Sequence, residues 1–187
     1  MEQAAYLVHI TKELSGRWTI PILLHLEKTG GRFTPLKNQL QISPSRLSNN
    51  LKLMSEANLI QYISPNERHH PLLPEYRLTD KGRFMKEVAL ILTEAEERLG
   101  CGVLATKMWN WPILVAISNH YTQFNEIKQL LQTATPKIIS TRLGELKEAS
   151  VVEKELIIEA KPKYIYQLNA FSAPILRETN QDLLSIL

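Results

Sequence analysis

The side chains best suited to chemistry in this sequence lie on one face of a predicted helix over residues 44–54. At helical spacing this face carries short hydrogen-bonding groups and cations, with no apolar residue among them: Ser45, Arg46, Ser48, Asn49 and Lys52. Leu47, Leu51 and Met54 recur at the spacing of the opposite, buried face. Hydroxyl, amide and cationic groups hydrogen-bond base edges in a DNA major groove and bind phosphates. The helix is therefore a candidate for reading DNA.

Individual roles follow from side-chain chemistry. Asparagine suits adenine and lysine suits guanine, so base-edge contacts are predicted for Ser45, Asn49 and Lys52. Phosphate contacts, which position a protein without reading sequence, are predicted for Thr34, Ser43, Arg46 and Ser48. Arg68, at the tip of a predicted hairpin, is a candidate for a minor groove or a phosphate. The alternative for each of them is a solvated surface side chain.

Other clusters predict little chemistry. The sequence shows no glycine-rich phosphate loop, nucleophile elbow or pair of catalytic carboxylates, so we expect no enzymatic activity. His69 and His70 are adjacent, but no cysteine or carboxylate cluster supports a metal site, and no cofactor is predicted. Trp18, Trp109 and Trp111 are expected to pack in cores, with a small aromatic ligand between domains as the alternative.

Helices and one hairpin must position the polar face. Apolar spacing and breakers predict helices over 3–14, 18–26, 35–41, 44–54 and 83–99, and strands over 61–63 and 76–78. Thr34, Ser43 and Thr79 precede three of these helices as expected N-caps. Three helices, a polar-faced helix after the short turn 41–42, and a hairpin form the pattern of a winged helix-turn-helix.

The same pattern occurs twice. Pro21 corresponds to Pro112, 91 residues later, and Pro44 corresponds to Pro136, 92 residues later. A period of this size is right for a small domain and too long for a solenoid repeat. We therefore expect a mainly α-helical, α+β fold with small β-wings, organised as a tandem of winged helix-turn-helix domains over residues 1–100 and 101–187.

The second copy has a weaker candidate reading face. Its predicted helix begins at Pro136 after the cap Thr135, and Gly144 stands where the first copy has Lys52. Its shorter wing is predicted over 153–159 and 164–168. The DNA-contact candidates here are Lys137, Ser140, Thr141, Arg142, Lys161 and Lys163. This copy could read DNA weakly or act as an internal dimerisation partner, and the sequence leaves both open.

Composition sets the class of protein. Net charge is +3, the sequence pI is about 8.9 and hydrophobic residues make up 44%, as in an ordinary soluble protein of mildly basic character. No apolar run approaches a membrane span and the first residues lack a signal-peptide layout, so we expect no membrane contact and a cytoplasmic location. The single cysteine, Cys101, excludes a disulfide within the chain.

Four ordered blocks resemble one family. They are Leu14-Ser15-Gly16-Arg17-Trp18-Thr19 with Ile22-Leu23, then Gly31-Arg32-Phe33 with Leu36, then Ile42-Ser43 with Leu47-Ser48 and Leu51, and Pro74-Glu75-Tyr76 with Leu78-Thr79 and Gly82. Together these blocks resemble the HxlR-type bacterial regulators over roughly residues 6–99.

The resemblance implies a winged-helix transcription regulator, similar in style to MarR proteins, that binds double-stranded DNA. It also implies dimerisation through terminal helices, so a homodimer or an intramolecular pseudo-dimer of the two copies is expected. Several members sense oxidants or electrophiles through a cysteine near the N-terminus, where this chain has none. No motif supports a small-molecule effector. The regulator is expected to be a repressor, and the alternative is a tandem winged-helix module that binds proteins without specific DNA binding.

Overall fold

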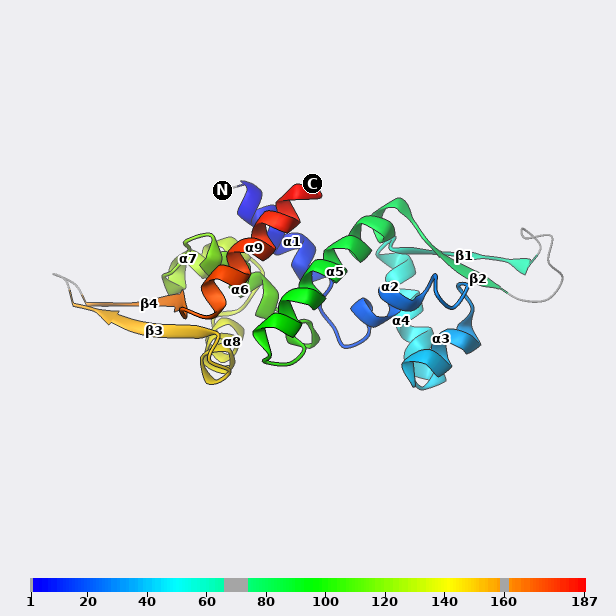
Figure 1. Cartoon of the computed structure of the whole chain (residues 1–187), viewed down its shortest axis with the longest axis horizontal. Helices are drawn as coiled ribbons and strands as arrows, with labels where there is room; N and C mark the ends of the chain where they lie inside the picture. The colour runs from blue at the N-terminus through cyan, green and yellow to red at the C-terminus, as the bar shows by residue number, and fades with distance from the viewer. Residues whose placement is uncertain (1, 66–73, 159–161) are drawn as a thin grey trace. The chain divides into compact units, whose positions relative to one another are not determined.

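The computed structural model describes residues 2–65, 74–158 and 162–187. The first copy contains α1 (Glu2–Glu13), α2 (Thr19–His25), α3 (Phe33–Leu40), α4 (Pro44–Glu56), β1 (Ile60–Ile63), β2 (Glu75–Leu78) and α5 (Asp80–Leu99) (Figure 1). The second contains the 3-10 helix η2 (Leu104–Thr106), α6 (Asn110–Ser118), α7 (Phe124–Leu131), α8 (Pro136–Glu148), β3 (Val152–Ile157), β4 (Lys163–Leu168) and α9 (Ser172–Ser185).

The two copies repeat one order of elements, which confirms the tandem winged helix-turn-helix fold. In each copy, three consecutive α-helices, α2 to α4 and α6 to α8, lie directly before an antiparallel hairpin and a last helix. The hairpins also share their register, because the pair Ile60–Leu78 in the first corresponds to Val152–Leu168 in the second. The strands of the second hairpin have six residues each against four in the first, although the segment that connects them is shorter, as the sequence predicted.

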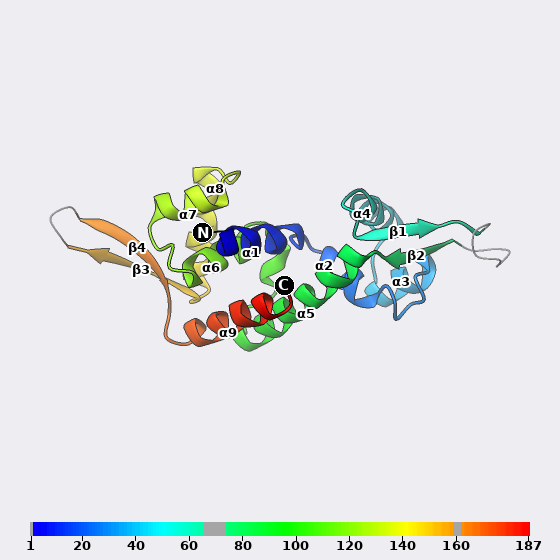
Figure 2. The same cartoon turned by 90° about the horizontal axis from the view of Figure 1, so that it is seen from above.

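The compact units do not follow the boundary between the repeats. One unit is Gly16–Leu90, and the other joins the first residues, through Ser15, to Ile91–Leu187. Helix α1 therefore packs with the second copy, against α6 and α7, although in sequence it lies at the start of the first copy (Figure 2). The domain ranges expected from the repeat are 1–100 and 101–187. They assign α1 and the end of α5 to the first domain, whereas both belong to the compact unit that contains the second copy.

The reason is the apolar surface of α6. All residues from Asn110 to Ile117 are buried, so this helix has no solvent face and needs cover on every side. Helix α1 supplies part of that cover with a stripe of buried residues that includes Leu7 and Ile10. Burying each such side chain contributes roughly 1.5–3 kcal/mol, which favours this arrangement over an exposed α6.

Capping hydrogen bonds occur at two of the four helix starts for which the sequence predicts a cap. Thr79 Oγ1 accepts a hydrogen bond of 2.9 Å from Gly82 N at the start of α5, and Thr135 Oγ1 accepts one of 3.3 Å from Ile138 N in α8. Ser43 occupies the N-cap position of α4, with Pro44 at N1, but its side chain makes no cap bond. Thr34 is not a cap, because α3 begins at Phe33 after Arg32 and Thr34 lies inside the first turn.

Glu96 is a buried carboxylate that joins the end of α5 to the second copy. Its side chain is 7% exposed, and Oε1 accepts hydrogen bonds from Ala105 N at 2.7 Å and from Trp111 Nε1 at 2.8 Å. Burial raises the pKa of this carboxyl, and the hydrogen bonds from Trp111 and Ala105 only partly oppose the rise. The tryptophan is thus a core residue whose polar atom is satisfied.

The raised pKa of Glu96 makes its contribution to stability depend on pH. A carboxyl with a higher pKa when folded binds its proton more tightly in the folded state, so its contribution is full below the unfolded pKa and is lost as pH rises through the folded pKa. We therefore expect the unfolding free energy of Glu96→Gln, relative to the native chain, to increase with pH across that window. Urea titrations at several pH values test this. Glu97→Gln, on the exposed side of the same helix, is the control for the loss of a carboxylate. A difference in unfolding free energy that does not change with pH for Glu96→Gln would contradict the assignment.

In the described part of the chain, no helix is long and apolar enough to cross a membrane. In the same part, no group of three or more His, Cys, Asp or Glu side chains is placed to hold a metal ion. His69 and His70 lie outside the described residues.

Candidate nucleic-acid interface

Helix α4 presents the predicted polar face to solvent. Leu47, Leu51 and Met54 are at most 4% exposed and anchor the opposite face in the core. The candidate contact residues on the helix are all exposed and share its outer side: Ser45, Arg46, Ser48, Asn49 and Lys52. Ser43, at the N-cap, and Thr34, on α3, are exposed as well. Leu53, 53% exposed, is an apolar residue beside this face that the sequence reasoning missed.

The turn before α4 fixes the direction of the helix. Gln41 ends α3 in the left-handed region, with φ of 51° and ψ of 37°, and Ile42 is buried directly after it. The Ile42 amide donates to the Lys37 carbonyl at 3.2 Å, which closes the turn. A left-handed residue that ends one helix and a buried residue before the next leave little freedom for the second helix.

The cations of α4 are available to a partner. Within the described residues, the one ion pair of Lys52 is a long contact of 3.9 Å with Glu56 across the exposed surface, and such pairs contribute little. Among the described residues, Arg46 has no side-chain partner, while its carbonyl accepts from Asn50 Nδ2 at 2.8 Å. Neither cation would have to break a strong ion pair to reach a phosphate or a base.

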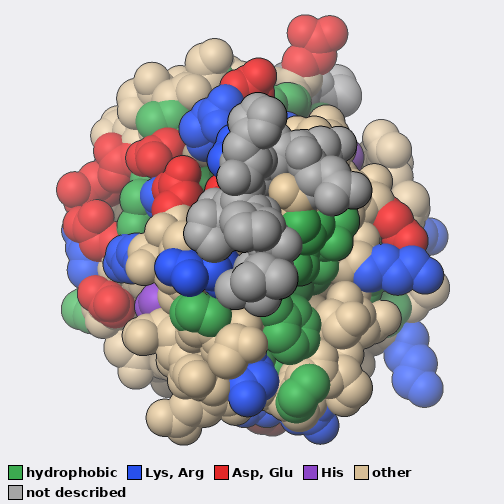
Figure 3. Space-filling view, turned by 90° about the vertical axis from the view of Figure 1, so that its right-hand side faces the viewer, with side chains coloured by type: hydrophobic (Ala, Val, Ile, Leu, Met, Phe, Trp, Pro, Cys, Tyr) green, Lys and Arg blue, Asp and Glu red, His purple; other side chains and the backbone are tan. Residues whose placement is uncertain are grey.

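The wing beside α4 carries an aromatic pair. Tyr62 and Tyr76 lie opposite each other on β1 and β2, with ring centroids 5.4 Å apart in an edge-on arrangement. Arg77 Nε pairs with Glu75 Oε1 at 2.6 Å. Arg68 lies outside the described residues. On the face of the molecule shown in Figure 3, the basic, acidic and hydrophobic side chains of the described residues are mixed, and those residues form no continuous basic field.

The equivalent face of α8 offers fewer side chains that could contact DNA than the face of α4 does. Lys137, Ser140 and Thr141 are exposed, but the Thr141 hydroxyl donates back to the Lys137 carbonyl at 2.9 Å. With the 92-residue offset, Ile138, 36% exposed, stands where α4 has Arg46. Gly144 is exposed and offers no side chain in place of Lys52.

Arg142 is held by an acidic neighbour. Its guanidinium pairs with Glu145, one turn along α8, and Lys107 Nζ binds the same carboxylate at 3.0 Å. Burial alone would raise the pKa of Glu145, but the hydrogen bonds from Arg142 and Lys107 outweigh it and lower that pKa. A carboxylate that stays ionised at neutral pH therefore competes with DNA for both cations.

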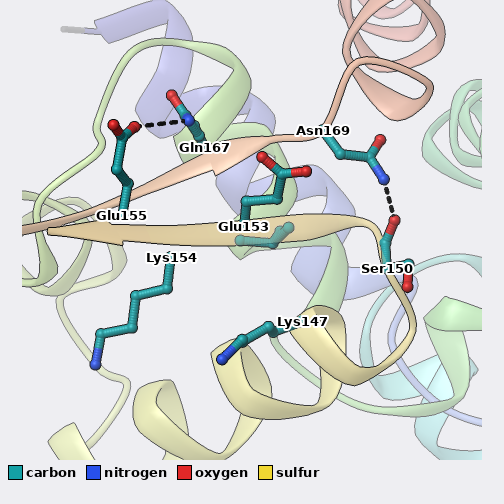
Figure 4. A pocket seen from close by; sticks show the side chains of 8 residues that line it. Lys147, Ser150, Glu153, Lys154, Glu155, Gln167 and Asn169 are labelled. Atoms are coloured by element: carbon teal, nitrogen blue, oxygen red, sulfur yellow. Dashed lines mark hydrogen bonds between the residues drawn. The ribbon is translucent and has the colours of Figure 1, made fainter.

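A groove between the end of α8 and β3 adds two cations that the sequence reasoning missed. Lys147 and Lys154 line it, and its volume is about 420 Å³. They extend to one side of the hairpin, while Glu155 and Gln167, joined by a 3.0 Å hydrogen bond, lie on the other (Figure 4). Lys154 Nζ lies 4.0 Å from the centre of the Tyr164 ring, which holds the lysine in place.

Lys154 could have been identified from the sequence, because successive side chains of a strand point to opposite faces. This alternation places Lys154 on the face opposite Glu153 and Glu155. Lys147 was identifiable only as a basic residue in the last turn of α8. Of the wing candidates, Lys163 lies on β4 and is half-buried, and Lys161 lies outside the described residues.

The paired helices, the exposed polar helix and the hairpin beside it define a winged helix-turn-helix protein. The HxlR-like helix-turn-helix family matches residues 13–99 and again 104–179, so the chain belongs to this family and carries its domain twice. Members of the family are transcription regulators. The second match shows that the divergent copy is still a recognisable family domain. The comparisons with curated proteins and with solved structures gave no match.

Proposed function

We propose that this protein is a sequence-specific, double-stranded DNA-binding regulator that places α4 in a major groove and the β1–β2 wing on the adjacent backbone or minor groove. The observation that carries the proposal is the outer face of α4, where five hydrogen-bonding or cationic side chains are exposed together over a buried leucine face. A helix of this kind after a tight turn suits major-groove entry. The proposed outcome is repression, which requires only that the protein occupy promoter DNA.

Each side chain has a proposed role. Ser45, Asn49 and Lys52 contact base edges, because they lie along the exposed face at helical spacing. Arg46, Ser48, Ser43 and Thr34 contact phosphates and fix the register. In the second domain, Lys137, Ser140, Thr141, Arg142, Lys161 and Lys163 form a weaker contact set. The wing residue Arg68 contacts the minor groove or a phosphate.

The direct test is selection of bound fragments from genomic DNA, followed by affinity measurements on the enriched duplex over a range of salt concentrations. We expect an enriched site, binding in the nanomolar to micromolar range, and a steep linear fall of log affinity with log salt. Failure to enrich any site, together with no salt-dependent affinity for duplex DNA, would rule out the proposed function.

The two domains are proposed to differ in role, with the first reading DNA and the second acting as a weaker reader or as an internal dimerisation partner. The last helices of the two copies share an exposed ion pair, in which Arg98 on α5 binds Glu178 on α9 at 2.6 Å. That hydrogen bond lowers the pKa of the Glu178 carboxyl and raises that of Arg98. Such pairing of equivalent helices supports a pseudo-dimer within one chain. Sedimentation of the free protein distinguishes it from a homodimer, which would double the mass.

A protein-binding module is the second candidate function. Two observations on the second domain favour it: Ile138 is exposed on α8, and Glu153 and Glu155 carry negative charge on the second wing. Neither feature suits a phosphate backbone. Pull-down of one stoichiometric partner from nuclease-treated lysate, with no duplex affinity in the purified protein, would favour this function over the first.

Lys147 and Lys154 provide a test of whether the second domain touches DNA. If both contact phosphates, replacing them with alanine should reduce the slope of log affinity against log salt by about two, and weaken all sequences equally. The matched control is Lys28→Ala with Arg177→Ala, which removes two exposed cations from other elements. An unchanged slope in the Lys147/Lys154 variant would show that this groove does not meet the DNA backbone.

A further inference from the structure

Two residues of the second copy have strained backbone conformations that their counterparts in the first copy lack. Trp109, before α6, has φ of 83° and ψ of −9°, whereas Trp18, before α2, has φ of −115° and ψ of −13°. Gln132, after α7, has φ of 49° and ψ of −63°, whereas Gln41, after α3, lies in the ordinary left-handed region. A positive φ is an outlier for a bulky side chain, and the negative ψ takes Gln132 out of the left-handed region.

Both strained residues line one pocket. The pocket has a volume of about 180 Å³ and lies between α1, Trp109 and residues 130–133 at the end of α7. All of these segments belong to the compact unit that contains the second copy. The Thr133 amide donates to the Leu131 carbonyl, which closes a tight three-residue turn around Gln132 shortly before α8 begins. Strained backbone is concentrated at functional sites such as ligand clamps, so this pocket is a candidate ligand site.

A cation at the pocket wall has no carboxylate partner among the described residues. Lys12 Nζ donates to Thr133 Oγ1 at 3.0 Å in an exposed contact and lies 4.7 Å from the centre of the Trp109 ring, and all three residues line the pocket. His9, also in the lining, binds Glu13 at 2.9 Å, but no carboxylate belongs to the lining itself. The Thr133 hydroxyl accepts from Lys12, so its own hydrogen remains available to a ligand. The ammonium and the hydroxyl together favour an anionic acceptor.

The size and the walls of the pocket restrict the anion. Sites for drug-sized ligands have volumes of roughly 300–1,000 Å³, so this smaller pocket admits only a short molecule. Ala5 and Leu130 line it and are half-buried, so they offer aliphatic surface to a ligand. The Trp109 ring is only 5% exposed and lies under the Lys12 ammonium, which makes it a poor platform for an aromatic ligand. An inorganic anion has no apolar part to place against Ala5 and Leu130.

We propose that the second winged-helix domain, together with α1, binds a short aliphatic monocarboxylate in this pocket, with the carboxylate at Lys12 Nζ and the Thr133 hydroxyl. The aliphatic part of the molecule lies against Ala5 and Leu130. The bound carboxylate ties the turn around Gln132 to α1 and so fixes the chain that enters α8. The binding does not depend on the proposed DNA function.

Direct binding to the full chain, at constant pH and ionic strength, tests the proposal. The probes are butyrate and isobutyrate, whose small size limits affinity to the millimolar range. Isobutyramide is the uncharged molecule of the same shape, and inorganic phosphate is an anion without an aliphatic part. We expect saturable NMR shifts of the Gln132 and Thr133 backbone amides with both carboxylates. Isobutyramide and phosphate should bind at least about tenfold more weakly.

Two variants locate the binding. Lys12→Met removes the charge, keeps the length of the side chain and should weaken isobutyrate binding by at least about tenfold. Ala5→Leu places a larger side chain at the pocket wall and should abolish binding while leaving Lys12 in place. The matched control is Lys128→Met, which removes an exposed lysine of α7 that does not line the pocket and should bind isobutyrate as the native chain does. Lack of saturable binding by both carboxylates, equally strong binding of isobutyramide or phosphate, or native binding by both pocket variants would overturn the proposal.

Discussion

Replacing Arg46 and Lys52 together by alanine should lower affinity for the selected duplex by about 100- to 1,000-fold. The two side chains are exposed on α4 and make no strong ion pair within the described residues, so their charges are available to DNA. Lys52 is proposed to read a base, and losing one good base contact costs about 1–3 kcal/mol of discrimination. Arg46 is proposed to bind a phosphate, so its loss weakens every sequence.

The single variants separate these roles. Lys52→Ala should relax the preference at one base pair, while Arg46→Ala should keep the preference and reduce the salt slope by about one. Affinity for a set of single-mismatch duplexes at several salt concentrations measures both. Lys28→Ala with Arg177→Ala, which removes the same net charge elsewhere on the surface, should leave specificity intact. If the Arg46/Lys52 variant binds the duplex as the native chain does, α4 is not the reading helix.

Sequence periodicity predicted α4, the helix proposed to read DNA, because its two faces differ so sharply. Leu47, Leu51 and Met54 alternate with polar residues at a helical period, and the structure buries those three positions while exposing the polar ones. Local signals were equally informative at Thr79 and Thr135, whose hydroxyls cap the helices that follow them. Helical periodicity and N-caps involve residues that are close in sequence, so they can be recognised from one amino-acid sequence.

Contacts between distant segments were not predictable in the same way. Helix α1 lies at the start of the first copy in sequence, yet it packs on α6 because residues on every side of α6 are buried. Arg142 is predicted to contact DNA, and in the structure its guanidinium pairs with Glu145, which also binds Lys107. Glu145 is one turn away and could have been noticed, whereas Lys107 comes from before α6. Compared with α4, the candidate contact face of α8 therefore lacks a lysine and has its arginine in an ion-pair network.

The glycine in the family-like Leu78-Thr79-x-x-Gly82 block has a physical explanation. A Cβ at Gly82 would lie 1.8 Å from the Leu59 carbonyl oxygen and 2.9 Å from its carbon, which are backbone atoms with little freedom to move. That carbonyl accepts the Thr79 amide at 3.1 Å. The glycine thus allows the start of α5 to lie directly against the chain that joins α4 to β1, where the wing begins.

Gly82→Ala should therefore lower the unfolding free energy of the unit Gly16–Leu90 by about 3 kcal/mol or more, at or above the upper range for an overpacked site. The displaced Leu59 carbonyl would weaken the bond from Thr79 and shift β1 relative to α5. Hydrogen exchange measures this locally: amides of α4 and β1 should exchange faster, and those of α8 should not change.

Gly144→Ala is the matched comparison for that substitution. Nothing lies within 4 Å of a Cβ at Gly144, which is an exposed position inside α8. Alanine there removes the conformational entropy cost of a helical glycine and should stabilise the protein by about 0.5–1 kcal/mol. Replacing glycine by alanine is thus expected to lower the free energy of unfolding at position 82 and to raise it at position 144. Equal effects on exchange and on urea unfolding would show that contact with the Leu59 backbone is not what requires glycine at position 82.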